Sequence, residues 1–123
     1  MFVLKIVTDF AAAHSLRNYP GDCARVHGHN WQVEVSVAAE TLDETGIAID
    51  FRSIKKHTKA VIKRFDHQYL NETQPFDTLN PTAENIAQHF YQAVGRLINT
   101  PTIRVQAVTI WETPRASVTY SQG

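Results

Sequence analysis

The sequence has little of several features that mark specialised classes of protein. It holds one cysteine in 123 residues, so it cannot form an internal disulfide, which is typical of a reducing compartment. It has no excess of charge of either sign, because twelve Lys and Arg residues balance twelve Asp and Glu residues. Dedicated nucleic-acid-binding proteins usually carry a basic excess, so we expect no nucleic-acid partner.

Long hydrophobic runs are also missing. No apolar stretch approaches the roughly 18 residues that cross a bilayer, and the first 13 residues lack a basic start and are interrupted by Asp9, unlike a signal peptide. We therefore expect no membrane contact and a cytoplasmic location. Hydrophobic residues make up 43% and charged residues 20% of the chain, and this balance and length predict a single globular domain over residues 1–123.

Hydrophobic periodicity predicts the secondary structure. Residues 2–14 and 27–37 alternate between apolar and polar positions, as do residues 103–112 and 116–120, and this period of two indicates strands. Residues 54–65 and 82–97 instead place apolar side chains at helical spacing, with Thr82 as an N-cap and Leu97 in the second apolar stripe. Residues 47–51 resemble a short extra strand.

The order of these elements predicts an α+β fold. We expect a four-stranded antiparallel sheet in the order ββααββ, with both helices on one face. A sheet this small leaves its edges unpaired, which favours a homo-oligomer.

Three histidines form the strongest candidate site. His27 and His29 are two residues apart on a strand, so both imidazoles project from one face. His14 ends the first strand on its apolar face, and the three rings converge if these strands form a hairpin. A single strand histidine is more often hydrogen-bonded within the core, but three on converging faces favour a metal. Three nitrogen ligands are typical of catalytic Zn²⁺, which keeps an open position.

Cys23 lies four residues before His27, in the loop that enters the second strand. It could close the metal site as a fourth ligand, or serve as a nucleophile or base beside an open one. Arg25 and a nearby dication would favour its thiolate form. The alternative is a small buried apolar residue, which is the common environment of a lone cysteine.

Two further carboxylates stand beside groups with which they could act. Asp66 precedes His67, and such a pair can shuttle a proton, although His67 could instead interact with a helix terminus. Glu112 ends an apolar strand beside Thr113. It could bind the amidine-like edge of a ligand through two hydrogen bonds, or be an ordinary exposed residue at a strand end.

Several separated motifs together resemble the 6-pyruvoyltetrahydropterin synthase family, and the resemblance runs through nearly the whole chain. They are Cys-Ala-Arg-Val-His-Gly-His-Asn at 23–30, Phe-Ala-Ala-Ala-His at 10–14, Ile-Asp-Phe at 49–51, Asp-His-Gln-Tyr-Leu-Asn at 66–71, Pro-Thr-Ala-Glu-Asn at 81–85 and Trp-Glu-Thr at 111–113. The spacing Cys-x-x-x-His-Gly-His is similar to the branch that makes 6-carboxytetrahydropterin in queuosine biosynthesis.

The resemblance implies a fold, a cofactor and a substrate. Family members have the tunnelling fold and assemble as homo-oligomers, here a hexamer built as a dimer of trimers, with active sites between subunits. The implied substrate is 7,8-dihydroneopterin triphosphate, and the implied products are 6-carboxytetrahydropterin, acetaldehyde and triphosphate. His14, His27 and His29 would bind Zn²⁺.

The resemblance also implies individual roles in this lyase reaction. Cys23 would remove a side-chain proton as thiolate, while Asp66 and His67 would relay a proton. Glu112 would bind the pyrimidinone edge of the pterin, with Thr113 and Arg25 as further substrate-binding residues. The only cation among residues 15–22 is Arg17, and no group there is identified as the triphosphate site.

Two alternatives remain at this point. A carbon–oxygen lyase that makes 6-pyruvoyltetrahydropterin would use the same zinc and proton machinery. A non-catalytic zinc protein would use Cys23 as a fourth ligand.

Overall fold

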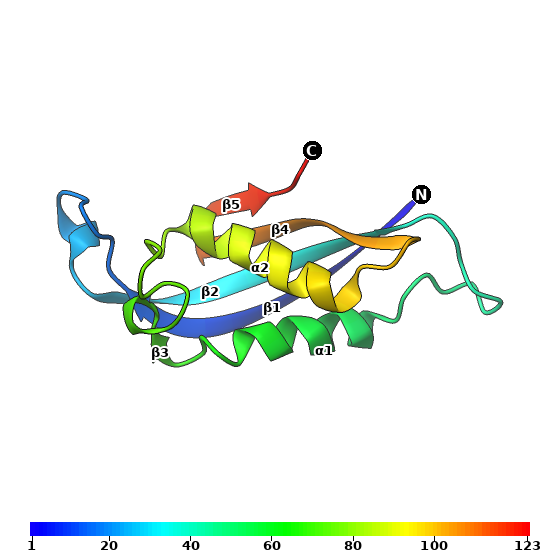
Figure 1. Ribbon diagram of the computed structural model, residues 1–123, viewed down its shortest axis with the longest axis horizontal. Helices are drawn as coiled ribbons and strands as arrows, with labels where there is room; N and C mark the ends of the chain where they lie inside the picture. The colour runs from blue at the N-terminus through cyan, green and yellow to red at the C-terminus, as the bar shows by residue number, and fades with distance from the viewer.

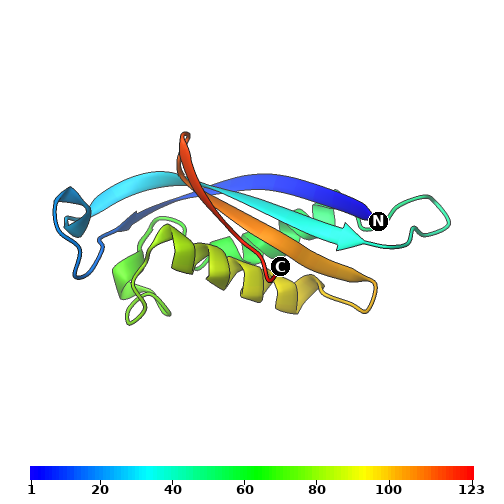
Figure 2. The same ribbon diagram turned by 90° about the horizontal axis from the view of Figure 1, so that it is seen from above.

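The computed structural model describes residues 1–22 and 24–123. Two long helices and a curved sheet form two layers, with both helices on one face of the sheet (Figures 1 and 2). The elements, in chain order, are β1 Phe2–His14, η1 Asp22–Ala24, β2 His27–Ala39, α1 Phe51–Ile62, β3 Gln68–Tyr69, η2 Leu70–Glu72, α2 Ala83–Ile98, β4 Ile103–Thr113 and β5 Ala116–Tyr120.

The predicted four-stranded antiparallel sheet and the ββααββ order were wrong in one respect. The sheet has five strands in the order β3-β1-β2-β4-β5, and β3 pairs with β1 in parallel, so the sheet is mixed. The N–H of His67 donates to the carbonyl of Ala11 and thereby attaches the chain to the edge of β1 as it leaves α1. A two-residue strand carries no periodicity, so the sequence pattern could not reveal it.

The alternating faces of β1 and β2 follow the predicted pattern where they meet the helices. Trp31, Val33, Val35 and Val37 are fully buried on β2, and Ile6 and Phe10 are buried opposite them on β1. Branched and aromatic side chains of this kind suit a half-buried strand. The β1–β2 pairing extends to His14 and His27 at one end of the sheet.

Each helix begins at a side-chain cap and buries one stripe of mainly apolar side chains. Asp50 accepts a hydrogen bond from the N–H of Arg52 at the start of α1, and Thr82 accepts one from the N–H of Asn85 at the start of α2. Such caps satisfy N–H groups that a helix leaves unpaired. In the part of the chain that the structure describes, neither helix is long and apolar enough to cross a membrane.

Two local expectations were wrong. Residues 47–50 are bend or irregular backbone, and Phe51 begins α1 instead of ending a strand, because Asp50 caps the helix there. Leu97 is exposed on α2, while the next residue, Ile98, faces the core. The last residue of the apolar stripe on α2 is therefore Ile98, one position later than predicted.

His89 on α2 is a titratable residue that packs against aromatic side chains of the core. Its ring contacts the rings of Phe65 and Phe76 at centroid distances of 5.4 and 5.6 Å, and its buried Nε2 has no hydrogen-bond partner among the described residues. Burial lowers the pKa of His89, and the charges of Arg64 and Arg96 lower it further. The folded protein therefore resists protonation at this ring.

We expect His89→Phe to reduce the acid sensitivity of the fold. Because the pKa is depressed in the folded state, stability is fully present above the unfolded pKa of about 6.5 and is lost as the pH falls below it. Urea unfolding should show that the variant gains stability relative to wild type between pH 7 and pH 5. Other titrating groups are common to both proteins, so they cancel in this difference, and parallel stability curves would contradict the prediction.

Candidate functional site

Three histidines converge at the end of the sheet where β1 leads into β2. His14 lies directly opposite His27 in the β1–β2 register, and His29 lies opposite Ala12. The ring of His14 is 4.5 Å from that of His27 and 5.3 Å from that of His29, between centroids. One ligand atom from each histidine and one from Glu112 all lie within 4.8 Å of one another. The pairing of β1 with β2 thus brings together three residues that the sequence predicted as metal ligands.

Backbone carbonyls orient two of these rings. Nδ1 of His14 donates to the carbonyl of Pro81 at 2.8 Å, and Nδ1 of His27 donates to the carbonyl of Arg25 at 2.7 Å. A carbonyl oxygen can only accept, so Nδ1 carries a proton in both rings, and the neutral form of each ring would present the lone pair of Nε2. Histidines that bind metals are commonly held by such outer hydrogen bonds.

The ring nitrogens that remain are suited to a metal ion. Nε2 of His14 and Nε2 of His29 are buried and have no hydrogen-bond partner among the described residues. Burial lowers the pKa of His14 and of His29, despite opposing effects that include the charge of Glu112, so both rings favour the neutral form that binds metals. Buried polar atoms without partners are costly, and a bound cation would remove that cost. The donor set fits Zn²⁺.

Glu112 reaches the same cluster from β4. Its Oε1 is 3.1 Å from Nε2 of His29 and 3.4 Å from Nε2 of His14. Pairing between β2 and β4, with Trp111 opposite Gln32, brings this distant residue to the histidines. The sequence indicated that Glu112 needs a partner, but nothing in its local pattern identified the histidines as its neighbours.

A pocket of about 400 Å³ adjoins His14 and Glu112. It lies between the start of α2 and the β4–β5 hairpin, and Leu16 and Tyr19 line it from the segment after β1. Thr82 and Glu84 line it from the start of α2. From the sequence, Thr82 was predicted only as a helix N-cap, and Glu84 was named only as part of a family motif. Their motif at residues 81–85 was the available signal that this segment faces a ligand.

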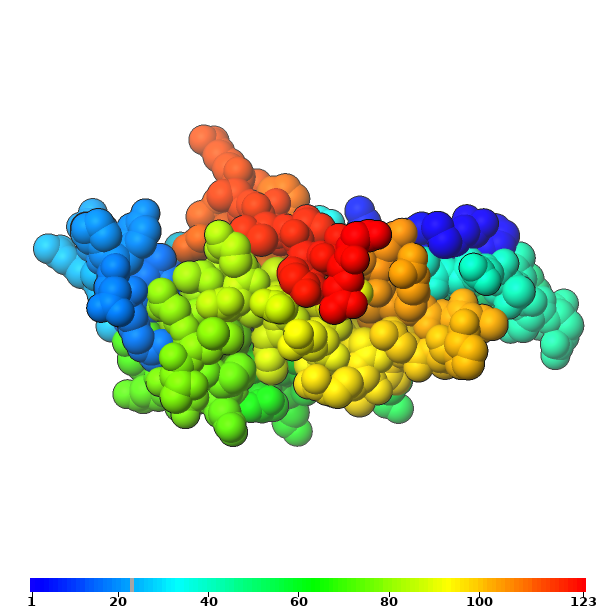
Figure 3. Space-filling model, turned by 45° about the horizontal axis from the view of Figure 1, so that its top comes forward, coloured from blue at the N-terminus to red at the C-terminus, as the bar shows by residue number. Residues whose placement is uncertain are grey.

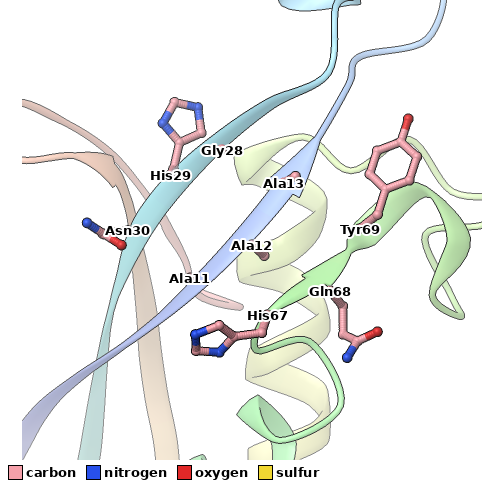
Figure 4. A pocket seen from close by; sticks show the side chains of 9 residues that line it. All are labelled: Ala11, Ala12, Ala13, Gly28, His29, Asn30, His67, Gln68 and Tyr69. Atoms are coloured by element: carbon pink, nitrogen blue, oxygen red, sulfur yellow. The ribbon is translucent and has the colours of Figure 1, made fainter.

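A second pocket, of about 540 Å³, lies across β1 and β2 near β3. Figure 4 shows His29 and Asn30 on β2 on one side of it, and His67, Gln68 and Tyr69 on the other. The predicted proton-relay residue His67 therefore borders the same pocket as one of the clustered histidines.

The carboxylate of Asp66 is placed to orient the imidazole of His67. Oδ1 of Asp66 is 3.0 Å from Nδ1 of His67 and accepts a hydrogen bond from the N–H of Ala11 at 3.0 Å. That backbone bond is the main reason that the pKa of Asp66 is lowered, with a smaller contribution from His67. His67 has a φ of 59°, a left-handed conformation in the turn that leads to β3.

The other predicted site residues are placed differently. Cys23 lies outside the described residues. Arg25 is exposed, and its carbonyl orients His27. Oγ1 of Thr113 accepts from the N–H of Arg115 within the β4–β5 turn. The guanidinium of Arg17 donates to backbone carbonyls, so it is not a free cation for a triphosphate.

Together these groups can bind a cation, bind a polar ring and transfer a proton. Three imidazoles can hold a divalent ion, which acts as a Lewis acid on oxygen ligands. Glu112 and Glu84 offer carboxylates to a ring with adjacent N–H donors. The Asp66–His67 pair can accept and return a proton.

Comparisons with known proteins identify the family of this chain. The family model described as 6-pyruvoyl tetrahydropterin synthase matches residues 4–123. A Synechocystis protein named 6-carboxy-5,6,7,8-tetrahydropterin synthase is 37% identical over 92 residues, covering 71% of this chain and 70% of the relative. A Bacillus subtilis protein of the same name is 32% identical over 117 residues, covering 89% and 78%.

A solved structure supports the same assignment. The Caenorhabditis elegans 6-pyruvoyl tetrahydropterin synthase superposes with a TM-score of 0.88 at 27% identity, covering 99% of this chain and 96% of that one. Its fold is therefore the fold of this protein. The chain belongs to the 6-pyruvoyl tetrahydropterin synthase family and is a lyase-type enzyme.

Proposed function

We propose that this protein is a zinc-dependent 6-carboxytetrahydropterin synthase of queuosine biosynthesis. It converts 7,8-dihydroneopterin triphosphate and one water molecule to 6-carboxytetrahydropterin, acetaldehyde and triphosphate. The observation that carries the proposal is the cluster of three histidines beside a pocket, in which the buried Nε2 atoms of His14 and His29 have no hydrogen-bond partner among the described residues. Relatives at 32% and 37% identity that bear this enzyme's name support the product assignment.

His14, His27 and His29 hold the metal ion in this proposal. Bound Zn²⁺ supplies Lewis acidity toward the hydroxyl groups of the substrate side chain. The carbonyls of Pro81 and Arg25 keep the rings of His14 and His27 in the ligating tautomer. Three protein ligands leave a position for substrate, as catalytic zinc sites require.

The pterin ring binds in the pocket beside His14. Glu112 lines this pocket and borders the histidine cluster, so it can accept hydrogen bonds from the ring edge while the side chain of the substrate extends toward the metal site. Glu84 lines the same pocket from α2 and offers a second carboxylate. A carboxylate pairs well with the adjacent N–H donors of a 2-amino-pyrimidinone. We assign substrate contacts to Thr113 and Arg25 on the resemblance alone.

Proton transfer is divided between two groups. Cys23, as thiolate, removes a proton from the substrate side chain. Asp66 is held ionised by the N–H of Ala11 and orients His67, which returns a proton during loss of triphosphate. The exposed side chain of His67 is accessible to a substrate carried by another subunit.

We also propose that the protein forms a homo-oligomer, a dimer of trimers, with active sites between subunits. Pairing between β3 and β1 involves only Ala12 and Ala13, so within the described residues the edge of β1 before Ala12 faces no other strand. Unpaired edges of this kind are sites for pairing with a second chain. Residues 1–123 as one domain and a cytoplasmic location complete the proposal.

Product analysis tests this function. Zinc-loaded protein is incubated with 7,8-dihydroneopterin triphosphate, and the products are identified by mass spectrometry. We expect 6-carboxytetrahydropterin together with acetaldehyde. Formation of 6-pyruvoyltetrahydropterin alone would move the protein to the other lyase activity, which the likeness to the Caenorhabditis elegans enzyme favours. Unchanged substrate with zinc bound would contradict both activities.

A further inference from the structure

The segment that follows β1 is held by two asparagine side chains from a distant part of the chain. Oδ1 of Asn71 accepts from the N–H of Ser15 at 2.9 Å, and its Nδ2 donates to the carbonyl of Ser15 at 2.8 Å. Asn80 makes the same pair of bonds with Arg17, at 2.9 and 3.3 Å. Each amide therefore binds both backbone groups of one residue, as a neighbouring strand would.

Arg17 completes the contact from the opposite direction. Its guanidinium donates to four backbone carbonyls at 2.7 to 3.3 Å, those of Asn71, Phe76, Asp77 and Leu79. The space-filling view shows the blue segment after β1 lying directly against the green segment that precedes α2 (Figure 3). Besides the pairs made by the asparagine amides with Ser15 and Arg17, the two segments are thus joined by these four side-chain-to-backbone hydrogen bonds. A fifth hydrogen bond joins two side chains, Oγ of Ser15 and the OH of Tyr69, at 2.9 Å.

The position of this segment matters for the pocket. Leu16 lies between the two clamped residues and lines the pocket that adjoins His14 and Glu112, as does Tyr19 just beyond. Ser15 directly follows His14, and Asn80 directly precedes Pro81, whose carbonyl orients the His14 ring. The same contacts therefore fix one wall of the pocket relative to the metal-ligand cluster.

We propose that Asn71 and Asn80 are positioning residues, which hold the backbone of residues 15–17 so that Leu16 and Tyr19 form a fixed wall of the substrate pocket. This inference rests on the proposed function for its substrate. It assigns Arg17 to the same clamp, as a structural cation that binds carbonyls. A substrate that meets a preformed wall loses less free energy to ordering the protein.

The test uses Asn71→Asp and Asn80→Asp in the zinc-loaded protein. Each change keeps the acceptor, removes the N–H donor and places a carboxylate against a backbone carbonyl. Asn99→Asp is the matched control, because Asn99 lies after the other end of α2 and its hydrogen bond to Val105 uses only the acceptor. We expect each clamp variant to raise KM by about tenfold, as loss of a hydrogen bond plus a repulsive contact would do, while zinc content and the control stay unchanged.

The split between KM and kcat separates positioning from stability. A variant that merely unfolds in part lowers apparent kcat with KM unchanged, whereas a displaced pocket wall raises KM. Each fall in kcat/KM corresponds to a loss of free energy. Because both asparagines hold one segment, the double variant should lose less free energy than the sum of the losses in the two single variants. Unchanged KM in both single variants would overturn the proposal.

Limited trypsin cleavage tests the clamp without any activity. Cleavage after Arg17 requires the clamped segment to open, whereas cleavage after the exposed Arg115 in the β4–β5 turn serves as the internal reference. We expect the ratio of the two rates to rise about tenfold in each clamp variant and to stay constant in Asn99→Asp. An unchanged ratio would show that the clamp does not hold the segment. Wild-type protein without turnover would contradict the proposed function, and the cleavage ratio would still decide whether the clamp exists.

Discussion

Replacing His27 with Ala is expected to remove zinc from the protein and to lower turnover on the order of a thousandfold, since metal activation contributes several kcal/mol to catalysis. His27 is one of three histidines that converge with Glu112, and its ring is already oriented by the carbonyl of Arg25. Two remaining imidazoles form an incomplete donor set. Zinc content by elemental analysis and steady-state product formation measure the two effects.

His57→Ala is the matched control for this change. His57 lies on α1, outside the histidine cluster, so the same substitution there should leave zinc content and turnover unchanged. If the His27→Ala protein kept one zinc ion per chain, the assignment of His27 as a ligand would be wrong.

Replacing Cys23 with Ala should abolish turnover while zinc stays bound. Loss of a general base typically lowers a rate by about 10²- to 10⁴-fold, and three histidines are sufficient to hold the metal. Because Cys23 lies outside the described residues, this expectation rests on the motif at residues 23–30. Zinc content, thermal unfolding and product formation are measured on the same sample.

The same experiment separates an enzyme from a structural zinc protein. If Cys23 closed the metal site as a fourth ligand, its replacement would release zinc and lower the unfolding temperature, and a catalytic role would be contradicted. The chain holds one cysteine, so alkylation of wild-type protein modifies this position alone. Protection from alkylation by the substrate would place the thiol at the binding site.

Local patterns predicted most of the secondary structure because each pattern reports on one face of one element. The alternation along β2 placed Trp31 and Val33 inside, and both are fully buried. It also placed His27 and His29 on one face, and their rings lie 4.8 Å apart between centroids. The Thr82 cap predicted the start of α2. Each of these features depends on neighbours only a few residues away.

Contacts between distant segments could not be predicted from these local patterns. The short strand β3 pairs with β1 across more than fifty residues, and Glu112 meets His14 and His29 only after β4 has paired with β2. In the sequence, Asn71 was only part of the motif at residues 66–71, and Arg17 was only the single cation of residues 15–22, with no role assigned to it. Their hydrogen bonds to each other's segments have no counterpart in either local sequence.

The sequence by itself determined the layered α+β character, both helices and the set of histidines, because these follow from periodicity and from residue chemistry. The tertiary structure alone decided how those histidines are oriented, which carboxylate joins them and how the pocket wall is held. The physical reason is that hydrogen bonds from His14 to Pro81 and from Arg17 to Phe76 join residues that come together only when the whole sheet and α2 have folded.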